Sequence, residues 1–201
     1  MSELPVDLTP DLAAVLASAL DREGKIGRAL EALGPVADRD VLLLDTPGGA
    51  IRHSLHELGA RLSDAPASAP LRFDAPDGSI DAVIAVWSAF RGVDSAEVAE
   101  ADRVLRLGGR LLVVHHYGRD DIAHVLDATE AVAWGRPFGP FLSNGFRVRV
   151  LHCWWTFDSL EAMGTFLGDA FGQRARAFGG TFKRPRLAHK VAVYHRTRPV
   201  T

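Results

Sequence analysis

Residues 99–114, AEADRVLRLGGRLLVV, carry the clearest structural signal in the sequence, a helix followed by a buried strand. Asp94 and Glu97 precede this stretch at the spacing of a capping box, with Asp94 in the capping role. Apolar positions at helical spacing continue the helix, and Gly108-Gly109 is expected to end it. The apolar run within residues 110–115 then predicts a strand that is buried on both faces, as in a parallel sheet.

The same alternation extends in both directions from this stretch. Further strands are expected at 41–44, 61–62, 80–87, 146–150 and 188–195. Helices are expected from Pro10, which follows the capping residue Thr9, and at 25–33, 51–59, 121–126 and 160–167. Strands that alternate with helices in this way predict an α/β fold with a parallel sheet and crossover helices.

Length and composition limit the class of protein. With 201 residues, of which 47% are hydrophobic and 24% charged, the chain suits one globular domain. No apolar run approaches the roughly 20 residues that cross a bilayer, and no secretory signal is visible. We therefore expect a cytoplasmic protein with no membrane partner. Cys153 is the single cysteine, which excludes an intramolecular disulfide and a cysteine-based zinc site.

Charge is divided unevenly along the chain. The net charge is −2, but residues 1–169 hold 15 basic and 25 acidic side chains, whereas residues 170–201 hold eight basic and no acidic ones. Phe178, Phe182 and Tyr194 lie among these basic residues, a pattern compatible with stacking on nucleic-acid bases. A solvated basic surface with aromatic residues in the core explains the same pattern.

Three segments together resemble the class I S-adenosylmethionine-dependent methyltransferases, in particular their small-molecule branch. They are residues 41–45, VLLLD, residues 76–83, PDGSIDAV, and residues 99–114. In that family the third segment contains a leucine-arginine-proline-glycine-glycine turn, in which Leu107 here replaces the proline. The resemblance implies a methyltransferase-like Rossmann fold, a single doubly wound and mostly parallel sheet of seven strands with helices on both faces.

The resemblance also implies how one domain over residues 1–201 is organised. N-terminal helices would occupy 1–36, the cofactor-binding half 40–118 and the C-terminal half 119–201. The last strand pair, at 146–150 and 188–195, would be partly antiparallel.

The turn after the first strand is where the resemblance places S-adenosylmethionine. The implied contacts are Asp45, Thr46, Gly48 and Gly49. Four steps separate Asp45 from Gly49, whereas the family has six between the acid and its last glycine, and Pro47 inside the turn has no N–H to donate. A tight turn that holds no ligand is therefore the alternative.

Three further residues are candidates for cofactor contacts that the resemblance implies. Asp64 is the candidate for the acid that accepts hydrogen bonds from the ribose hydroxyls, although the matching position falls nearer Pro66. Asp74 is the candidate for the acid that contacts the adenine amino group. Trp87 follows a buried strand, where the substrate and the methionine end of the cofactor would lie. Ordinary loop aspartates and a large residue at a strand end are the alternatives.

Polar residues follow the strand at the end of the opening stretch. His116 is a candidate general base because the unperturbed pKa of histidine lies near neutrality, and Tyr117 is a candidate for orienting a substrate. Alternation along the strand sends His115 and His116 to opposite faces, so at most one of them faces the site. Asp120 and Asp121 are explained as helix-capping residues, and no metal site is expected.

Three functions remain open at this point. The first is methyl transfer from S-adenosylmethionine to a small molecule. The second is a methyltransferase-like domain that has lost the cofactor and binds a protein partner or another ligand. The third is binding or modification of nucleic acid through the basic C-terminal segment. The cluster Cys153-Trp154-Trp155 is compatible with a core position or with a contact between copies of the chain.

Overall fold

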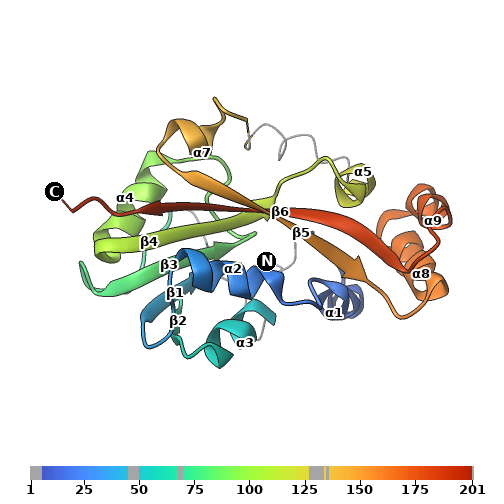
Figure 1. The fold of residues 1–201 in the computed structure, drawn as a ribbon, viewed down its shortest axis with the longest axis horizontal. Helices are drawn as coiled ribbons and strands as arrows, with labels where there is room; N and C mark the ends of the chain where they lie inside the picture. Colours follow the sequence, from blue (N-terminus) through green and yellow to red (C-terminus); the bar gives the residue numbers. More distant parts are fainter. Residues whose placement is uncertain (1–5, 45–49, 68–69, 127–133, 135, 201) are drawn as a thin grey trace.

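The computed structural model describes residues 6–44, 50–67, 70–126, 134 and 136–200. A six-stranded sheet in the order β2-β1-β3-β4-β6-β5 runs through the molecule (Figure 1). Neighbouring strands from β2 to β4 are parallel, and β6 is antiparallel to both β4 and β5. The strands are β1 Asp40–Leu44, β2 Arg61–Asp64, β3 Ile80–Val86, β4 Leu105–His116, β5 Arg147–Thr156 and β6 Arg186–Thr197. The mostly parallel α/β sheet predicted from the sequence is confirmed.

The resemblance implied seven strands, but the described residues form six, so the predicted number of strands was wrong. Between β2 and β3, residues 70–79 form no strand. Leu71 and Phe73 are instead buried in the core. The backbone N–H of Phe73 donates to Oε1 of Glu100 at 2.8 Å, so a side chain satisfies the group that a strand neighbour would otherwise satisfy.

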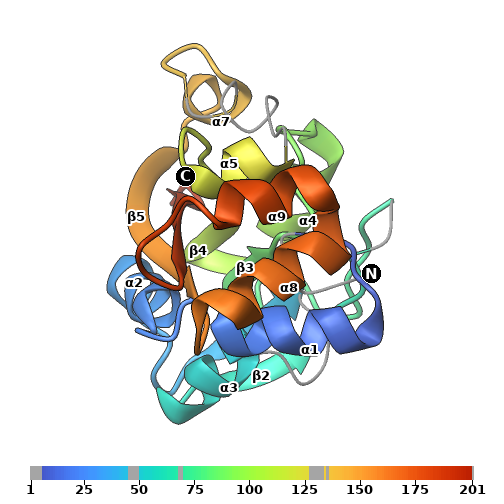
Figure 2. The ribbon, with the colours of Figure 1, turned by 90° about the vertical axis from the view of Figure 1, so that its right-hand side faces the viewer.

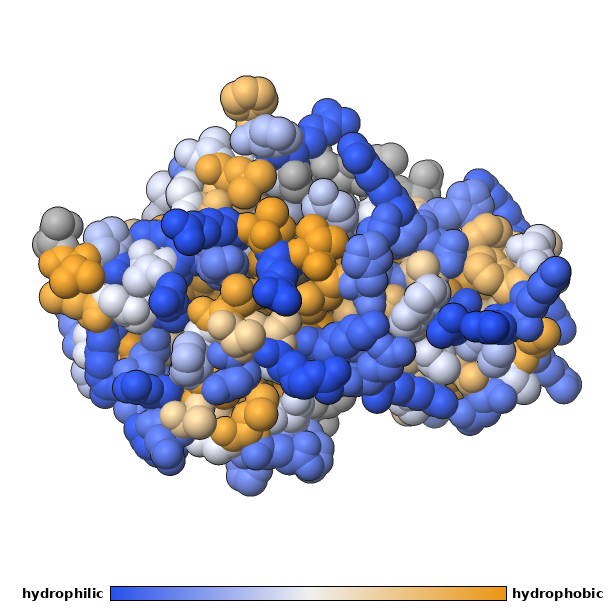
Figure 3. Space-filling view, viewed as in Figure 1, coloured by the Kyte–Doolittle hydropathy of each residue, from blue (hydrophilic) through white to orange (hydrophobic). Residues whose placement is uncertain are grey.

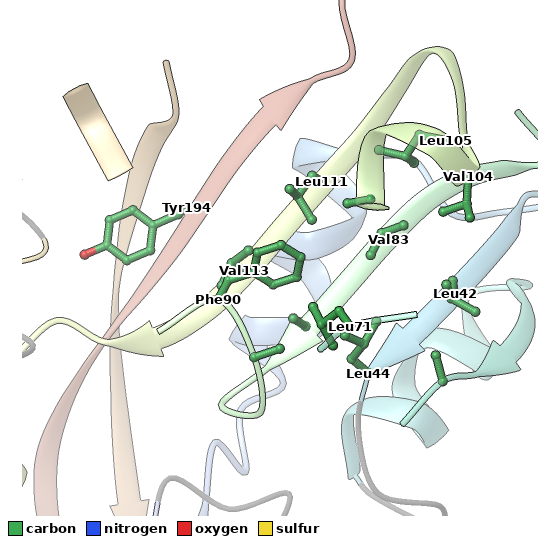
Figure 4. Close-up of a cluster of buried hydrophobic side chains, with 14 of the residues drawn as sticks. Leu42, Leu44, Leu71, Val83, Phe90, Val104, Leu105, Leu111, Val113 and Tyr194 are labelled. Carbon is green, nitrogen blue, oxygen red and sulfur yellow. The ribbon is translucent and has the colours of Figure 1, made fainter. Parts of the chain in front are cut away.

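Helices cover both faces of the sheet, as a doubly wound fold requires. They are α1 Pro10–Ala19, α2 Lys25–Leu33, α3 Ala50–Glu57, α4 Ser95–Val104, α5 Asp121–Leu126, α7 Pro140–Ser143, α8 Leu160–Phe171 and α9 Gln173–Gly179. Residues of α4 and α7 pack on one face and form what we call the first core, part of which Figure 4 shows. Residues of α2 and α3 pack on the other face and form the second core.

The opening stretch of the sequence folds largely as predicted. Asp94 caps α4, accepting a hydrogen bond from the N–H of Ala96 at 2.6 Å. The helix ends at Val104 rather than at Gly108-Gly109, and β4 begins at once with Leu105. Leu105 is fully buried and pairs with Ile80, so burial draws this residue into the sheet. The glycines lie in the irregular part of the β3–β4 pairing, where Gly108 has a φ of +80°.

The strands β5 and β6 extend past the end of β4. The β4–β6 pairing ends where His116 meets Val191, while β6 continues back to Arg186 with β5 as its partner. Around this extension α1, α5, α8 and α9 pack into a third core that includes Trp155 and Phe166. Figure 2 shows α8 and α9 in front of the sheet with α1 beside them. This third core therefore stands at the carboxyl edge of the parallel strands.

None of the helices in the described ranges is long and apolar enough to cross a membrane. Figure 3 shows apolar side chains gathered near the middle of one face, surrounded by polar ones.

Candidate functional site

The order of the strands reverses at β1 and β3, which lie side by side at the centre of the sheet. From β1 the chain passes through α3 on the second-core face to β2. From β3 it passes through α4 on the first-core face to β4. In open α/β sheets such a reversal leaves a crevice outside the carboxyl ends of the strands, which is where ligands bind. At this point Ser88 Oγ donates to the Leu44 carbonyl at 2.5 Å and links the two strand ends.

The predicted cofactor residues fall in different places. Asp45, Thr46, Gly48 and Gly49 lie outside the described residues. Asp64 ends β2, opposite Leu43 of β1, so it lies at the same edge as Ser88.

The carboxylate of Asp64 has a partner within the chain. Its Oδ1 forms an ion pair with Arg52 of α3, and both side chains are partly exposed. The other carboxylate oxygen has no hydrogen bond to any part of the chain that the structure describes. The acid after β2 is therefore present, but it is already paired on one side.

Asp74 lies elsewhere. Its neighbours Phe73 and Ala75 bond to Glu100 and Arg103, in the last turn of α4. Because α4 runs back from the carboxyl edge to the start of β4, this turn lies toward the amino edge of the sheet. The structure therefore does not bring Asp74 together with Asp64.

Trp87 stands directly after β3 in a constrained conformation. Its φ is +50°, which is unusual for a residue with a side chain, and the residue is only 4% exposed. Its indole nitrogen is buried and makes no hydrogen bond within the described part of the chain. The ring stacks near that of His189, with 6.3 Å between the ring centroids. Backbone strain and an unsatisfied polar atom thus coincide at this strand end.

His115 and His116 point to opposite faces of β4, as alternation predicts. His115 is buried beside Phe141 in the first core, and its Nε2 lies 3.1 Å from the carbonyl oxygens of both Ala89 and Phe90. Burial lowers the pKa of His115 to about 4, so it is a neutral donor that holds the loop after β3.

His116 lies on the other face and contacts a histidine that the sequence analysis did not single out. Its Nδ1 is 3.0 Å from Nε2 of His189 on β6. His189 is fully buried, and Nε1 of Trp155 on β5 donates to its Nδ1 at 3.1 Å. Burial holds the pKa of His189 well below its usual value. The alternation of Leu187, His189 and Val191 on β6 is the sequence signal that places His189 on an inward face.

Tyr117, Asp120 and Asp121 connect the end of β4 to β6. The backbone N–H of Tyr117 donates to the carbonyl of Lys190 at 2.9 Å, and the Tyr117 side chain packs against the first core. Asp120 caps α5 through the N–H of Ala123 at 2.7 Å. These bonds agree with the capping role expected for Asp120, and the described residues contain no group of side chains that could hold a metal ion.

Several basic residues of the C-terminal segment make contacts with other residues of the chain. Arg196 pairs with Asp102 at 3.0 Å, and Arg198 donates to the carbonyl of Leu105. Arg186 lies over the ring of Trp154, 4.3 Å from its centroid. These contacts fix β6 and its neighbours, which agrees with a structural role for part of the basic segment.

Comparison with known proteins identifies the fold. The sequence matches no protein-family model and no curated protein. A candidate type II methyltransferase from Anaeromyxobacter dehalogenans is 18% identical and aligns over 88% of this chain and 96% of its own, with a TM-score of 0.54. A candidate methyltransferase of an antibiotic biosynthesis pathway, from Anabaena variabilis, is 13% identical and aligns over 89% of this chain and 98% of its own, also with a TM-score of 0.54. The chain therefore has the Rossmann-like fold of the methyltransferases, as the resemblance of its sequence implied.

Proposed function

We propose that this chain binds S-adenosylmethionine at the carboxyl edge of β1, β2 and β3 and transfers its methyl group to a small molecule. The observation that carries the proposal is the reversal of strand order between β1 and β3, with Ser88 and Asp64 at the adjoining strand ends. A doubly wound sheet offers one such crevice, and it is the place where nucleotide ligands bind.

The described residues fit the cofactor in two respects. Asp64 keeps one carboxylate oxygen without a hydrogen bond in the described part of the chain, and this oxygen can accept from a ribose hydroxyl. The buried indole nitrogen of Trp87 has no hydrogen-bond partner among the described residues, and it is a donor at the end of β3, two strands away from Asp64 in the sheet. When bound, the cofactor supplies a methyl group on a positively charged sulfur, so the protein has mainly to hold the acceptor in line with it.

Calorimetric titration with S-adenosylmethionine and S-adenosylhomocysteine tests this proposal. We expect micromolar binding by the unmodified protein and at least a tenfold loss of affinity in Asp64→Ala. Asp74→Ala is the matched control, because Asp74 is also an exposed aspartate but lies toward the amino edge. Absence of binding near millimolar ligand contradicts the proposal, and equal losses in both variants contradict the role of Asp64.

The ion pair between Arg52 and Asp64 favours a second candidate function, a methyltransferase-like domain that no longer binds the cofactor. In that case the arginine takes the place of the ribose at the end of β2. The same titration with Arg52→Ala separates the two functions. Binding that appears only in this variant supports the loss of the cofactor in the natural protein, and the search then turns to protein partners.

A further inference from the structure

Three side chains from three adjacent strands form a buried chain of hydrogen bonds. Trp155 of β5 donates to His189 of β6 at 3.1 Å, and His189 lies 3.0 Å from His116 of β4. Trp155 and His189 are both fully buried. His116 is half-buried at the end of β4, beside the carboxyl edge where the proposed site lies. The chain therefore leads from the interior of the third core to that edge.

The chemistry of the indole fixes the direction of every bond in this chain. An indole nitrogen is only a donor, so Nδ1 of His189 must accept and carries no proton. The proton of a neutral His189 is then on Nε2, which faces His116. Since that nitrogen donates, Nδ1 of His116 must be the acceptor. The roles are assigned from the hydrogen-bond network, in which each step follows from the one before.

We propose that Trp155 and His189 are positioning residues that hold His116 in a single neutral tautomer, with its proton on Nε2. Any other state of His116 brings two donors face to face. A proton on Nδ1 of His116 requires Nε2 of His189 to accept, which moves the proton of His189 to Nδ1, against the indole N–H. In a site this deeply buried, such an unsatisfied donor is costly.

The surroundings of His189 support this assignment. The ring of Trp87 stacks near one side of His189, and Trp155 also meets it edge-on, with 5.7 Å between the ring centroids. Cys153 on β5 is the cross-strand partner of His189, and burial keeps its thiol neutral. Neutral groups therefore pack around His189, and burial favours the neutral form of its ring.

The tautomer changes the role that His116 can have in methyl transfer, an inference that rests on the proposed function. With Nδ1 engaged by His189 and a proton on Nε2, neither ring nitrogen of His116 is available to take up a proton, so in this tautomer His116 is not the general base of the proposed reaction.

Nitrogen-15 NMR of the histidine rings tests the tautomer directly and needs neither cofactor nor substrate. The chain has eight histidines, and the signals of His116 are identified by their loss in His116→Gln. We expect the unmodified protein to show a protonated Nε2 and an unprotonated Nδ1 for His116. A protonated Nδ1, or equal populations of the two tautomers, overturns the proposal.

Two tryptophan variants test the positioning role. Trp155→Phe keeps an aromatic ring but removes the indole N–H, so both tautomers of His189 become available, and the two nitrogen signals of His116 should move toward each other. Trp154→Phe is the matched control, because Trp154 points to the other face of β5 and stacks with Arg186. An unchanged His116 in Trp155→Phe, or an equal change in both variants, overturns the role of Trp155.

These experiments distinguish a failure of the positioning proposal from a failure of the proposed function. A protein that fails to bind S-adenosylmethionine but shows the single tautomer refutes the function and supports the positioning of His116. A protein that binds the cofactor with His116 in the other tautomer refutes only the positioning.

Discussion

The carboxylate of Asp121 accepts a hydrogen bond from the backbone N–H of Ala188, with 2.7 Å between Oδ2 and the nitrogen. Asp120 does the same for the N–H of Lys190. These two groups belong to the part of β6 that has passed the end of β4, so no strand on that side can satisfy them. The paired aspartates therefore replace a strand partner and attach α5 to the sheet edge.

Asp121→Ala is expected to lower the free energy of unfolding by about 1–3 kcal/mol, because the N–H of Ala188 loses its partner. Asp121→Asn should lose less, since its side-chain oxygen can still accept. Asp169→Ala, an exposed aspartate of α8, is the control and should change stability by less than about 0.5 kcal/mol. Urea unfolding measures all three. Equal effects of Asp121→Ala and Asp169→Ala would contradict the role of the bond.

Glu100 is expected to make stability depend on pH. The hydrogen bonds from Arg103, and then that from the N–H of Phe73, lower the pKa of the buried Glu100 from 4.5 to about 2. Because the folded pKa is the lower one, the stabilisation is fully present above pH 4.5 and is lost as the pH falls toward 2. A shift of this size corresponds to about 3 kcal/mol.

Urea unfolding of Glu100→Gln across this pH range checks the prediction. The variant should be less stable than the unmodified protein at pH 7, and the difference should shrink as the pH falls from about 5 to 2. Glu161→Gln, in the exposed first turn of α8, should show no such convergence. A difference that stays constant with pH would show that Glu100 acts only through packing.

Cys153 is expected to be unreactive in the folded protein. The residue is buried, and desolvation, followed by the charge of Asp21, raises the pKa of its thiol to about 12. Only the thiolate reacts with disulfide reagents, so at pH 8 the folded chain should react far more slowly than the chain in denaturant. A chromogenic thiol assay measures both rates, with Cys153→Ala as the blank. Fast reaction without denaturant would contradict this burial.

The sequence predicted those elements of the fold that depend on local patterns, such as helical spacing and capping residues. Lys25–Leu33 is a helix as expected, and Asp94 caps α4 as expected, because both features depend on local spacing. The predicted end of α4 was wrong. Gly108-Gly109 indicated a later end, whereas the helix ends at Val104 because Leu105 pairs with β3, a strand that is distant in the sequence. The seventh strand came from the resemblance alone, since only six segments of the sequence indicate strands.

The candidate site was less accessible to sequence reasoning, because it is assembled across strands. His116 was singled out by its place after a strand, but its partner His189 is 73 positions away. That Asp64 pairs with Arg52 could not be predicted without knowing where α3 lies over β2. Asp120 was correctly explained as a capping residue, but the bonds that Asp120 and Asp121 make to β6 depend on the length of that strand and could not be predicted.

Gly27 and Gly164 offer a last prediction, because both lie in helices but only one is crowded. A Cβ at Gly27 in α2 would lie 2.1 Å from Oγ and 3.1 Å from Cβ of Ser54 in α3, whereas one at Gly164 in α8 meets nothing within 4 Å. Alanine favours a helix over glycine by about 0.5–1 kcal/mol. Gly164→Ala should therefore raise the free energy of unfolding by about that amount.

Gly27→Ala should instead lower the free energy of unfolding by about 1–3 kcal/mol, the cost of overpacking. Ser54→Ala removes the nearer of the two atoms, so the double variant Gly27→Ala/Ser54→Ala should lose less than the sum of the single variants. Urea unfolding of the four proteins of this cycle, with Gly164→Ala alongside, measures the coupling. Additive losses would mean that Gly27 and Ser54 are not in contact. The close packing of α2 on α3 would then depend on other residues.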